Sequence, residues 1–170
     1  TAIAAFALAL TQIITEEPIK VQAEKLSDET RASVLASAEE FESMEFDNES
    51  YPNILEIHKG LKDGETVGYV IKTANNGYGG LIEVIVGIDS KGTVTGVRIS
   101  EHSETPGLGA KAQEPKFYEQ YKGKSAGSSL ANNEINAITG ATVTSNAVTG
   151  AVNFAIEYYT AELVSGGDSK

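Results

Sequence analysis

The pattern of hydrophobic and polar positions changes several times along the chain. Residues 1–14 are largely apolar and uncharged, and from Val21 to Phe46 apolar residues recur at spacings of three and four with glutamates between them. The first pattern indicates part of a membrane helix, and the second an amphipathic helix. Short β-branched runs come next, and another helical pattern covers about 143–162. The predicted order is therefore helix, strands, helix.

The β-branched runs predict two β-hairpins in one sheet. Gly, Asn and Asp residues separate the runs, which is typical of antiparallel strands joined by tight turns. The expected strands are 54–57, 66–72, 81–88 and 94–99, and a short helix is expected at 115–121. We predict an α+β fold in which a twisted antiparallel sheet of two hairpins packs against helices, preceded by an N-terminal membrane helix.

Four parts are expected along the chain. The apolar start is shorter than the roughly 20 residues that cross a bilayer, so we expect the sequence to begin part-way through a longer span. Glu16 and Glu17 follow it and favour an outward-facing side for what comes after. A cleaved signal peptide is the alternative, although no small-x-small cleavage site follows. The predicted parts are a membrane anchor at 1–19, an amphipathic helical linker at 20–50, a ligand-binding domain at 51–164 and a flexible tail at 165–170.

Charge and composition exclude several classes of function. The chain of 170 residues has a formal net charge of -11, which phosphate backbones would repel, so no nucleic acid partner is expected. The absence of cysteine excludes disulfides, thiol catalysis and iron–sulfur clusters, and with only two histidines no metal site is expected. Any redox chemistry would therefore need an organic cofactor.

Two loops differ from ordinary connections. The loop at 76–80 contains three glycines, which allow close approach of the backbone to a ligand, and Tyr78 offers a flat ring. The loop at 104–109 places Leu108 where a turn is usually polar, which suits packing against a flat ring. An exposed hairpin turn and a turn whose leucine covers the core are the alternative interpretations.

The stretch 136–153 contains no charged residue although the chain is acidic, and it is rich in hydroxyl groups at the expected start of the last helix. Gly140 and Ala141 leave the backbone N–H groups accessible there, and such a helix start attracts phosphate. No lysine follows Gly140, so the segment is not a Walker-type loop. A threonine N-cap is the alternative interpretation.

These three segments carry a resemblance to a known family. ITGATVTSNAV at 138–148 resembles the [S/T]GAT flavinylation motif of the covalent FMN-binding domain family, which the RnfG and NqrC proteins share. GYGG at 77–80 and ETPGLGAK at 104–111, in that order upstream, resemble the flavin-pocket loops of the same family. The total length is closer to RnfG proteins than to the longer NqrC proteins. The family pattern carries aspartate where this chain has Asn136.

The resemblance implies a set of cofactor contacts. FMN would be joined by a phosphoester to Thr142, with hydroxyl donors from Thr139 and Thr144 and room provided by Gly140 and Ala141. The ring would be framed by Tyr78, Thr105 and Leu108, and phosphate charge would be offset by Lys111. Further expected contacts are Gly79, Glu104 and Gly109. Residues 51–164 would then be the FMN-binding domain.

The resemblance also implies a place in a larger assembly. The chain would be an electron-transfer subunit of the Rnf complex, a membrane ion pump that couples ferredoxin and NAD redox chemistry. It would not turn over a substrate alone. Its partners would be other Rnf subunits, including a second flavin-carrying one, and an ApbE-like flavin transferase that installs FMN. A single membrane pass would hold the globular domain on the extracytoplasmic side of the cell membrane.

Two other functions stay open from the residues alone. A membrane-tethered module that binds flavin or another phosphorylated ligand non-covalently would use the same glycine loops and helix start. A hydrolase would use Thr142 or Ser145 as a nucleophile, and His102 is the base that the sequence offers. No Gly-x-Ser-x-Gly motif supports the hydrolase.

Overall fold

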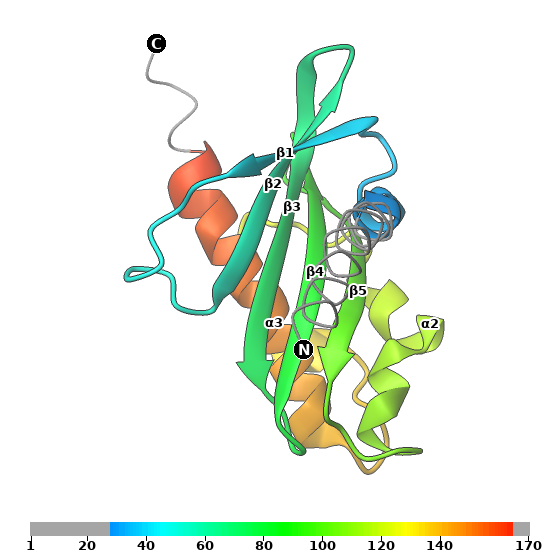
Figure 1. Ribbon diagram of the computed structural model, residues 1–170. Helices are drawn as coiled ribbons and strands as arrows, with labels where there is room; N and C mark the ends of the chain where they lie inside the picture. Colours follow the sequence, from blue (N-terminus) through cyan, green and yellow to red (C-terminus); the bar gives the residue numbers. More distant parts are fainter. Residues whose placement is uncertain (1–27, 165–170) are drawn as a thin grey trace, which may run out of the picture. The chain divides into compact units, whose positions relative to one another are not determined.

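The computed structural model describes residues 28–164 (Figure 1). The chain divides into two compact units, Thr1–Thr30 and Arg31–Lys170, and the fold below is that of the second. The predicted membrane anchor and the predicted tail lie outside the described residues. Within the described part of the chain, no helix has both the length and the apolar character needed to span a membrane.

Five antiparallel strands form one meandering sheet in which each strand pairs with the next along the chain. The strands are β1 (Glu40–Met44), β2 (Ile54–Lys62), β3 (Glu65–Asn76), β4 (Leu81–Asp89) and β5 (Val94–His102). The α+β prediction is confirmed, as are the four predicted strands, which are longer in the structure. The two predicted hairpins account for β2 to β5, and β1 is an additional strand that was not predicted.

The predicted helix from Val21 to Phe46 is wrong beyond residue 34. Residues 28–34 are helical, but a turn follows and β1 pairs with β2, so that Phe41 lies opposite Gly60. The apolar spacing was misleading because a helix end, a turn and a strand follow one another here and all bury apolar side chains against the same face of the sheet. These side chains include Val34, Leu35 and Phe41. Spacing alone does not separate these cases from one continuous helix.

The opposite face of the sheet packs against α3 (Thr142–Tyr158), which crosses behind the sheet in Figure 1. Its buried residues, including Val148 and Val152, share one core with the inward side chains of β4 and β5. Two polar groups of β3 bond to the helix backbone: Thr73 Oγ1 donates to the carbonyl of Ala151 at 2.9 Å, and Asn75 Nδ2 to that of Ala147 at 3.0 Å. These bonds fix the helix along the sheet.

The two helices predicted in the C-terminal half of the chain are confirmed. The short helix is α2 (Pro115–Tyr118), continued by a 3-10 turn at Glu119–Tyr121, and α3 continues as a π-helical segment at Tyr159–Val164. Further 3-10 turns lie at Gly109–Gln113 and Asn132–Glu134. The loop at 104–109 and the start of α3 lie beside each other in the folded chain.

Tyr121 is fully buried, and its hydroxyl bonds to Thr149 Oγ1 at 2.8 Å. Burial raises the pKa of Tyr121 to about 12, and the bond to Thr149 offsets only part of this effect. The neutral phenol is therefore favoured in the fold. We expect the contribution of the neutral phenol to the free energy of unfolding to be fully present below pH 10, the ordinary pKa of tyrosine. This contribution of about 2–3 kcal/mol should be lost as the pH rises through about 12. Denaturation midpoints across that range test this, and Tyr121→Phe should remove this part of the slope.

Candidate functional site

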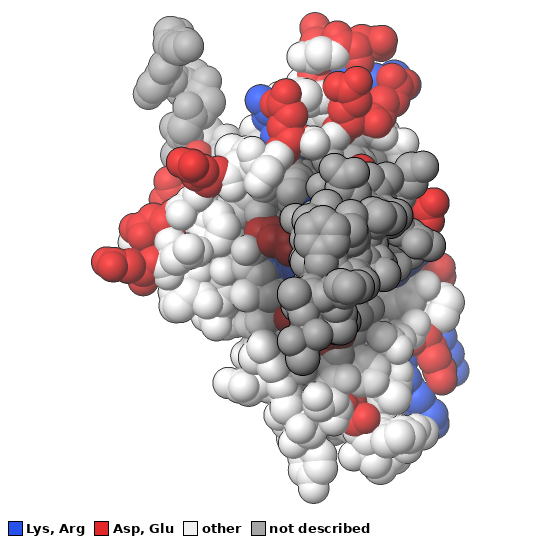
Figure 2. Space-filling model, viewed as in Figure 1, with Lys and Arg blue, Asp and Glu red and all other residues white. Residues whose placement is uncertain are grey.

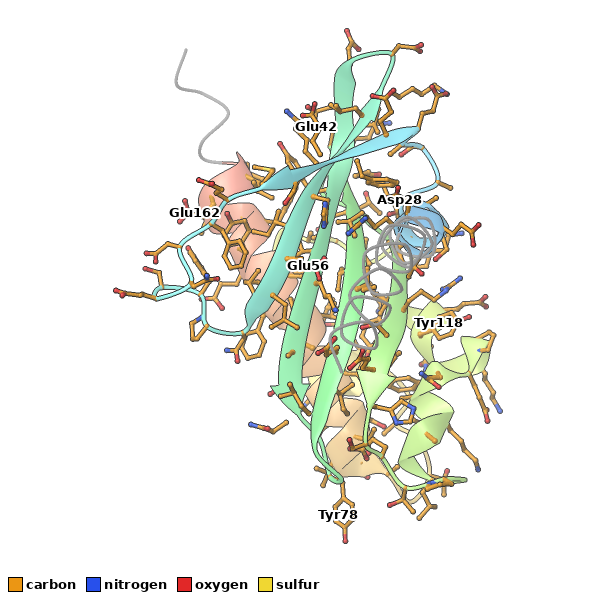
Figure 3. All side chains as sticks on the ribbon, in the orientation of Figure 1. Asp28, Glu42, Glu56, Tyr78, Tyr118 and Glu162 are labelled. Carbon is orange, nitrogen blue, oxygen red and sulfur yellow. The ribbon has the colours of Figure 1, made fainter. Side chains whose placement is uncertain are left out.

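The three segments singled out in the sequence meet in one cleft at the end of the sheet where β3 turns into β4. Its volume is about 460 Å³. It is lined by Tyr78, Glu104, Thr105, Leu108, Gly109, Gly140, Ala141, Thr142, Val143 and Thr144. All of the predicted cofactor contacts lie here except Gly79, Lys111 and Thr139. Figure 3 shows Tyr78 projecting from the tip of the β3–β4 hairpin, away from the body of the domain.

The rim of the cleft is apolar and exposed. Tyr78 is 76% exposed, and Leu108 and Val143 are about half exposed. On the face shown in Figure 2, charged atoms are sparse at this end and acidic atoms gather at the opposite end. Such a rim suits a flat aromatic ligand, because exposed apolar side chains lose unfavourable contact with water when a ring covers them.

Glu104 joins the three segments. Its carboxylate is buried: Oε1 accepts the N–H of Gly79 at 2.9 Å, and Oε2 accepts the hydroxyl of Thr144 at 2.5 Å. The N–H of Glu104 itself donates to His102 Nδ1 at 3.1 Å. One side chain therefore holds the glycine loop, its own loop and the first turn of α3 in register.

Gly79 is a glycine because the loops pack backbone to backbone. A Cβ on this residue would collide with the backbone carbonyl of Ser103. A backbone group cannot swing away as the end of a long side chain would. Close packing of the two loops therefore explains Gly79 without any ligand. Gly79 lies outside the cleft lining and supports it through its bond to Glu104.

We expect Gly79→Ala to lower the free energy of unfolding by about 1–3 kcal/mol, as overpacking does elsewhere. The collision with Ser103 should push the two loops apart and weaken ligand retention in the same variant. The matched control is Gly127→Ala, where the added Cβ meets only the flexible hydroxyl of Ser125. Equal stability of the two variants in chemical denaturation would contradict the packing argument.

Thr142 is the first residue of α3 and is exposed. The N-cap is Ala141, and no side chain among the described residues caps the helix, so the threonine N-cap interpretation is wrong. Gly140, at a φ of 79°, makes the left-handed turn that leads into the helix. The first turn of α3, all of it described, contains no acidic residue. The exposed hydroxyl of Thr142 therefore stands at a helix start that carries no acidic side chain of its own, while the buried carboxylate of Glu104 accepts from Thr144 in the same turn.

Three expected contacts are placed differently from the prediction. The hydroxyl of Thr144 is buried and donates its single proton to Glu104, so in this arrangement it cannot donate to a phosphate as expected. Lys111 and Thr139 line a neighbouring groove of about 460 Å³, beside Asn136, rather than the cleft. A ligand bound in the cleft would therefore have to extend across residues 139–141 to contact Lys111 or Thr139 in the groove.

The structure weakens the hydrolase interpretation. The Ser145 hydroxyl is buried, donates to the carbonyl of Ala141 at 2.9 Å and accepts the N–H of Ile138 at 2.9 Å. His102 lines a different pocket, where its Nδ1 accepts the N–H of Glu104. These groups serve to hold the backbone in place.

Two residues of the site were missed in the sequence. Val143 lines the cleft, and its place directly after Thr142 at the start of a helix was the available signal. Gln120 bonds to both backbone groups of Asn136. The sequence carries no signal for Gln120, because its partner is a backbone that comes near only through folding.

Comparison with known proteins places these features in one class: residues 77–157 match the FMN-binding domain family. The chain is 39% identical to the G component of the Na(+)-translocating ferredoxin:NAD(+) oxidoreductase complex of Acetobacterium woodii, over 94% of this chain and 86% of that protein. It is 36% identical to the G component of the ion-translocating oxidoreductase complex of Methanosarcina acetivorans, over 95% of this chain and 90% of that protein. The chain belongs to the RnfG family, which comprises the G components of ion-translocating oxidoreductase complexes.

Solved structures share the fold. The chain matches NqrC of Shewanella oneidensis with a TM-score of 0.56 at 24% identity, over 67% of this chain and 61% of that protein. The C component of the Na(+)-translocating NADH-quinone reductase of Parabacteroides distasonis matches with a TM-score of 0.51 at 24% identity, with 63% of each chain covered. The five-stranded sheet packed on α3 is therefore a known α+β architecture.

Proposed function

We propose that the protein carries FMN bound covalently to Thr142 and passes electrons through it within a membrane-bound Rnf complex. The general function, that of an FMN-carrying electron-transfer subunit of an ion-translocating complex, follows from the FMN-binding domain and from family membership. The covalent bond at Thr142 rests on one observation. An exposed hydroxyl stands at the open start of α3, on the rim of the cleft that the three segments form.

The residues present suit this cofactor. A phosphodiester at Thr142 carries a negative charge, and the N-terminus of α3, whose own first turn contains no acidic residue, stabilises an anion. Tyr78, Leu108 and Val143 provide the apolar surface that a flavin ring needs. When bound, FMN supplies the electron-transfer chemistry that a chain without cysteine lacks. The side chains bind and orient the cofactor.

The attachment reaction uses FAD as the donor and a flavin transferase of the ApbE type as the catalyst. The Thr142 oxygen forms a bond to the phosphorus on the FMN side of FAD, and the pyrophosphate P–O bond breaks. AMP leaves, and the proton of the hydroxyl passes to a base of the transferase. No oxidation or reduction occurs in this step. Exposure of Thr142 is a requirement of the reaction, because the acceptor must enter the active site of another enzyme.

The proposed setting is the extracytoplasmic side of the cell membrane. A single N-terminal span would anchor the domain, and its electron partners would be other Rnf subunits, including a second flavin-carrying one. The relatives named above are components of ion-translocating complexes, which supports a membrane setting. Covalent attachment has a physical reason there, since a flavin lost outside the cytoplasm is not readily replaced.

The test is the intact mass of the denatured protein after co-expression with a flavin transferase. We expect a gain equal to FMN minus water, localised to Thr142 by fragmentation. An unmodified mass in protein that has met an active transferase would refute the covalent assignment. The alternative, a module that binds flavin or another phosphorylated ligand non-covalently, would then hold, and its flavin would stay in the supernatant on acid precipitation.

A further inference from the structure

The residues that lead to Thr142 are exposed, but their backbone is held in place from beneath. We name residues 136–142 the attachment segment; it contains no charged side chain. Asn136, Ala137, Thr139 and Gly140 are all exposed, and Thr142 at its end is exposed too. An exposed, uncharged and glycine-containing stretch would ordinarily sample many conformations. Here specific side chains oppose that freedom.

The first restraint comes from Gln120. Its Oε1 accepts the N–H of Asn136 at 2.8 Å, and its Nε2 donates to the carbonyl of Asn136 at 3.2 Å. The side-chain amide thus pairs with one residue of the backbone as a neighbouring β-strand would. Gln120 is itself half-buried in the 3-10 turn Glu119–Tyr121, and its Nε2 also donates to the carbonyl of Phe117 at 3.2 Å. The start of the attachment segment is therefore fixed.

The second restraint comes from Ser145, within α3. Its hydroxyl accepts the N–H of Ile138 and donates to the carbonyl of Ala141, both at 2.9 Å. The N–H of Ala141 in turn donates to the carbonyl of Ile138 at 2.9 Å. The backbone of the attachment segment is held at its beginning and near its end, while most of its side chains remain accessible.

This arrangement suits a segment that another protein must bind in one conformation. An enzyme that reads a short peptide loses affinity when the peptide must first be ordered, and loses less when the fold orders it beforehand. We propose that Gln120 is a positioning residue that presents the attachment segment to the flavin transferase. The inference rests on the proposed function, since it concerns how Thr142 reaches the enzyme that modifies it.

The expected signature is kinetic. If Gln120 no longer holds Asn136, only part of the protein presents the competent conformation, and the apparent affinity of the transferase falls by that fraction. Once the segment is bound, the chemistry at Thr142 is unchanged. We therefore expect the KM of the transferase for Gln120→Met protein to rise about tenfold, with kcat close to that of the original chain, as the loss of hydrogen bonds of ordinary strength implies.

The chain offers a matched control in Asn153 of α3. Its side-chain amide makes the same kind of pair with Leu130: Oδ1 accepts the N–H at 2.7 Å and Nδ2 donates to the carbonyl at 3.0 Å. Asn153→Leu removes an equivalent pair outside the attachment segment. We expect it to lower the melting temperature about as much as Gln120→Met does, and to leave the KM unchanged. A third variant, Gln120→Glu, keeps the acceptor for the N–H of Asn136 but replaces the donor by a carboxylate oxygen that faces the carbonyls of Asn136 and Phe117. Its KM should therefore rise at least as much as that of Gln120→Met.

The experiment measures flavinylation of the full chain by a purified transferase with FAD, well below the melting temperature of every variant. A raised KM for Gln120→Met with unchanged kcat, and none for Asn153→Leu, supports the inference. An unchanged KM for both Gln120 variants overturns it, as does an equal rise for Asn153→Leu, because general loss of stability then explains the effect. If the original chain itself takes up no flavin, the proposed function fails and this inference with it.

Discussion

Thr142→Ala is expected to lose covalent flavin completely, because the variant lacks the oxygen that forms the phosphoester. Thr142 is exposed, so the substitution removes little packing and the fold should persist. The change in the free energy of unfolding should stay within about 0.5 kcal/mol. The measurements are flavin fluorescence retained in the acid-precipitated protein and the intact mass after co-expression with a transferase.

Two variants make this prediction sharp. Thr142→Ser keeps a hydroxyl at the same backbone position and should retain covalent flavin. Thr139→Val removes a neighbouring exposed hydroxyl and should also retain it, since Thr139 lies on the side of the neighbouring groove. Covalent flavin on Thr142→Ala protein would make Thr139 the acceptor to test next, because Thr144 and Ser145 are both buried and hydrogen-bonded.

Glu104→Ala is expected to have the largest effect on stability among the site residues. The substitution leaves the buried hydroxyl of Thr144 without its partner and also removes the bond to the N–H of Gly79, which is partly exposed. A buried polar group without a partner costs about 1–3 kcal/mol, so the free energy of unfolding should fall by about 3 kcal/mol. Chemical denaturation of the full chain measures this. The three segments should also separate, and uptake of flavin at Thr142 should slow.

Glu104→Gln is the matched comparison. The amide keeps the shape of the side chain and an oxygen that accepts from Gly79, while the Thr144 hydroxyl must turn to accept from the new NH₂ group. We expect a loss of about 1 kcal/mol. Glu101→Ala, which removes an exposed carboxylate nearby, should change stability by less than about 0.5 kcal/mol. If Glu104→Ala behaved like Glu101→Ala, the junction at Glu104 would not be what holds the three segments.

Local patterns were sufficient for much of the fold. The four strands 54–57, 66–72, 81–88 and 94–99 and the last helix were correct because each is a continuous run whose own residues favour that structure. β1 was missed because three of its five side chains are exposed and two are glutamates, and only pairing with β2 makes it a strand. Its sequence, EFESM, carries no signal that distinguishes it from the end of an amphipathic helix.

The chemistry proposed at Thr142 came from the resemblance of residues 138–148 to a flavinylation motif, which is visible in the amino-acid sequence because the motif is contiguous. The sequence also identified the loops that line the cleft, since glycine and an exposed leucine in a turn are local signals. How these parts are held became visible only in the folded chain. Glu104 bonds across sequence separations of 25 and 40 residues, and Gln120 bonds across 16. Such bonds depend on distances that only the folded sheet and α3 bring about, and for that reason Thr144 turned out to support Glu104 rather than to face a phosphate.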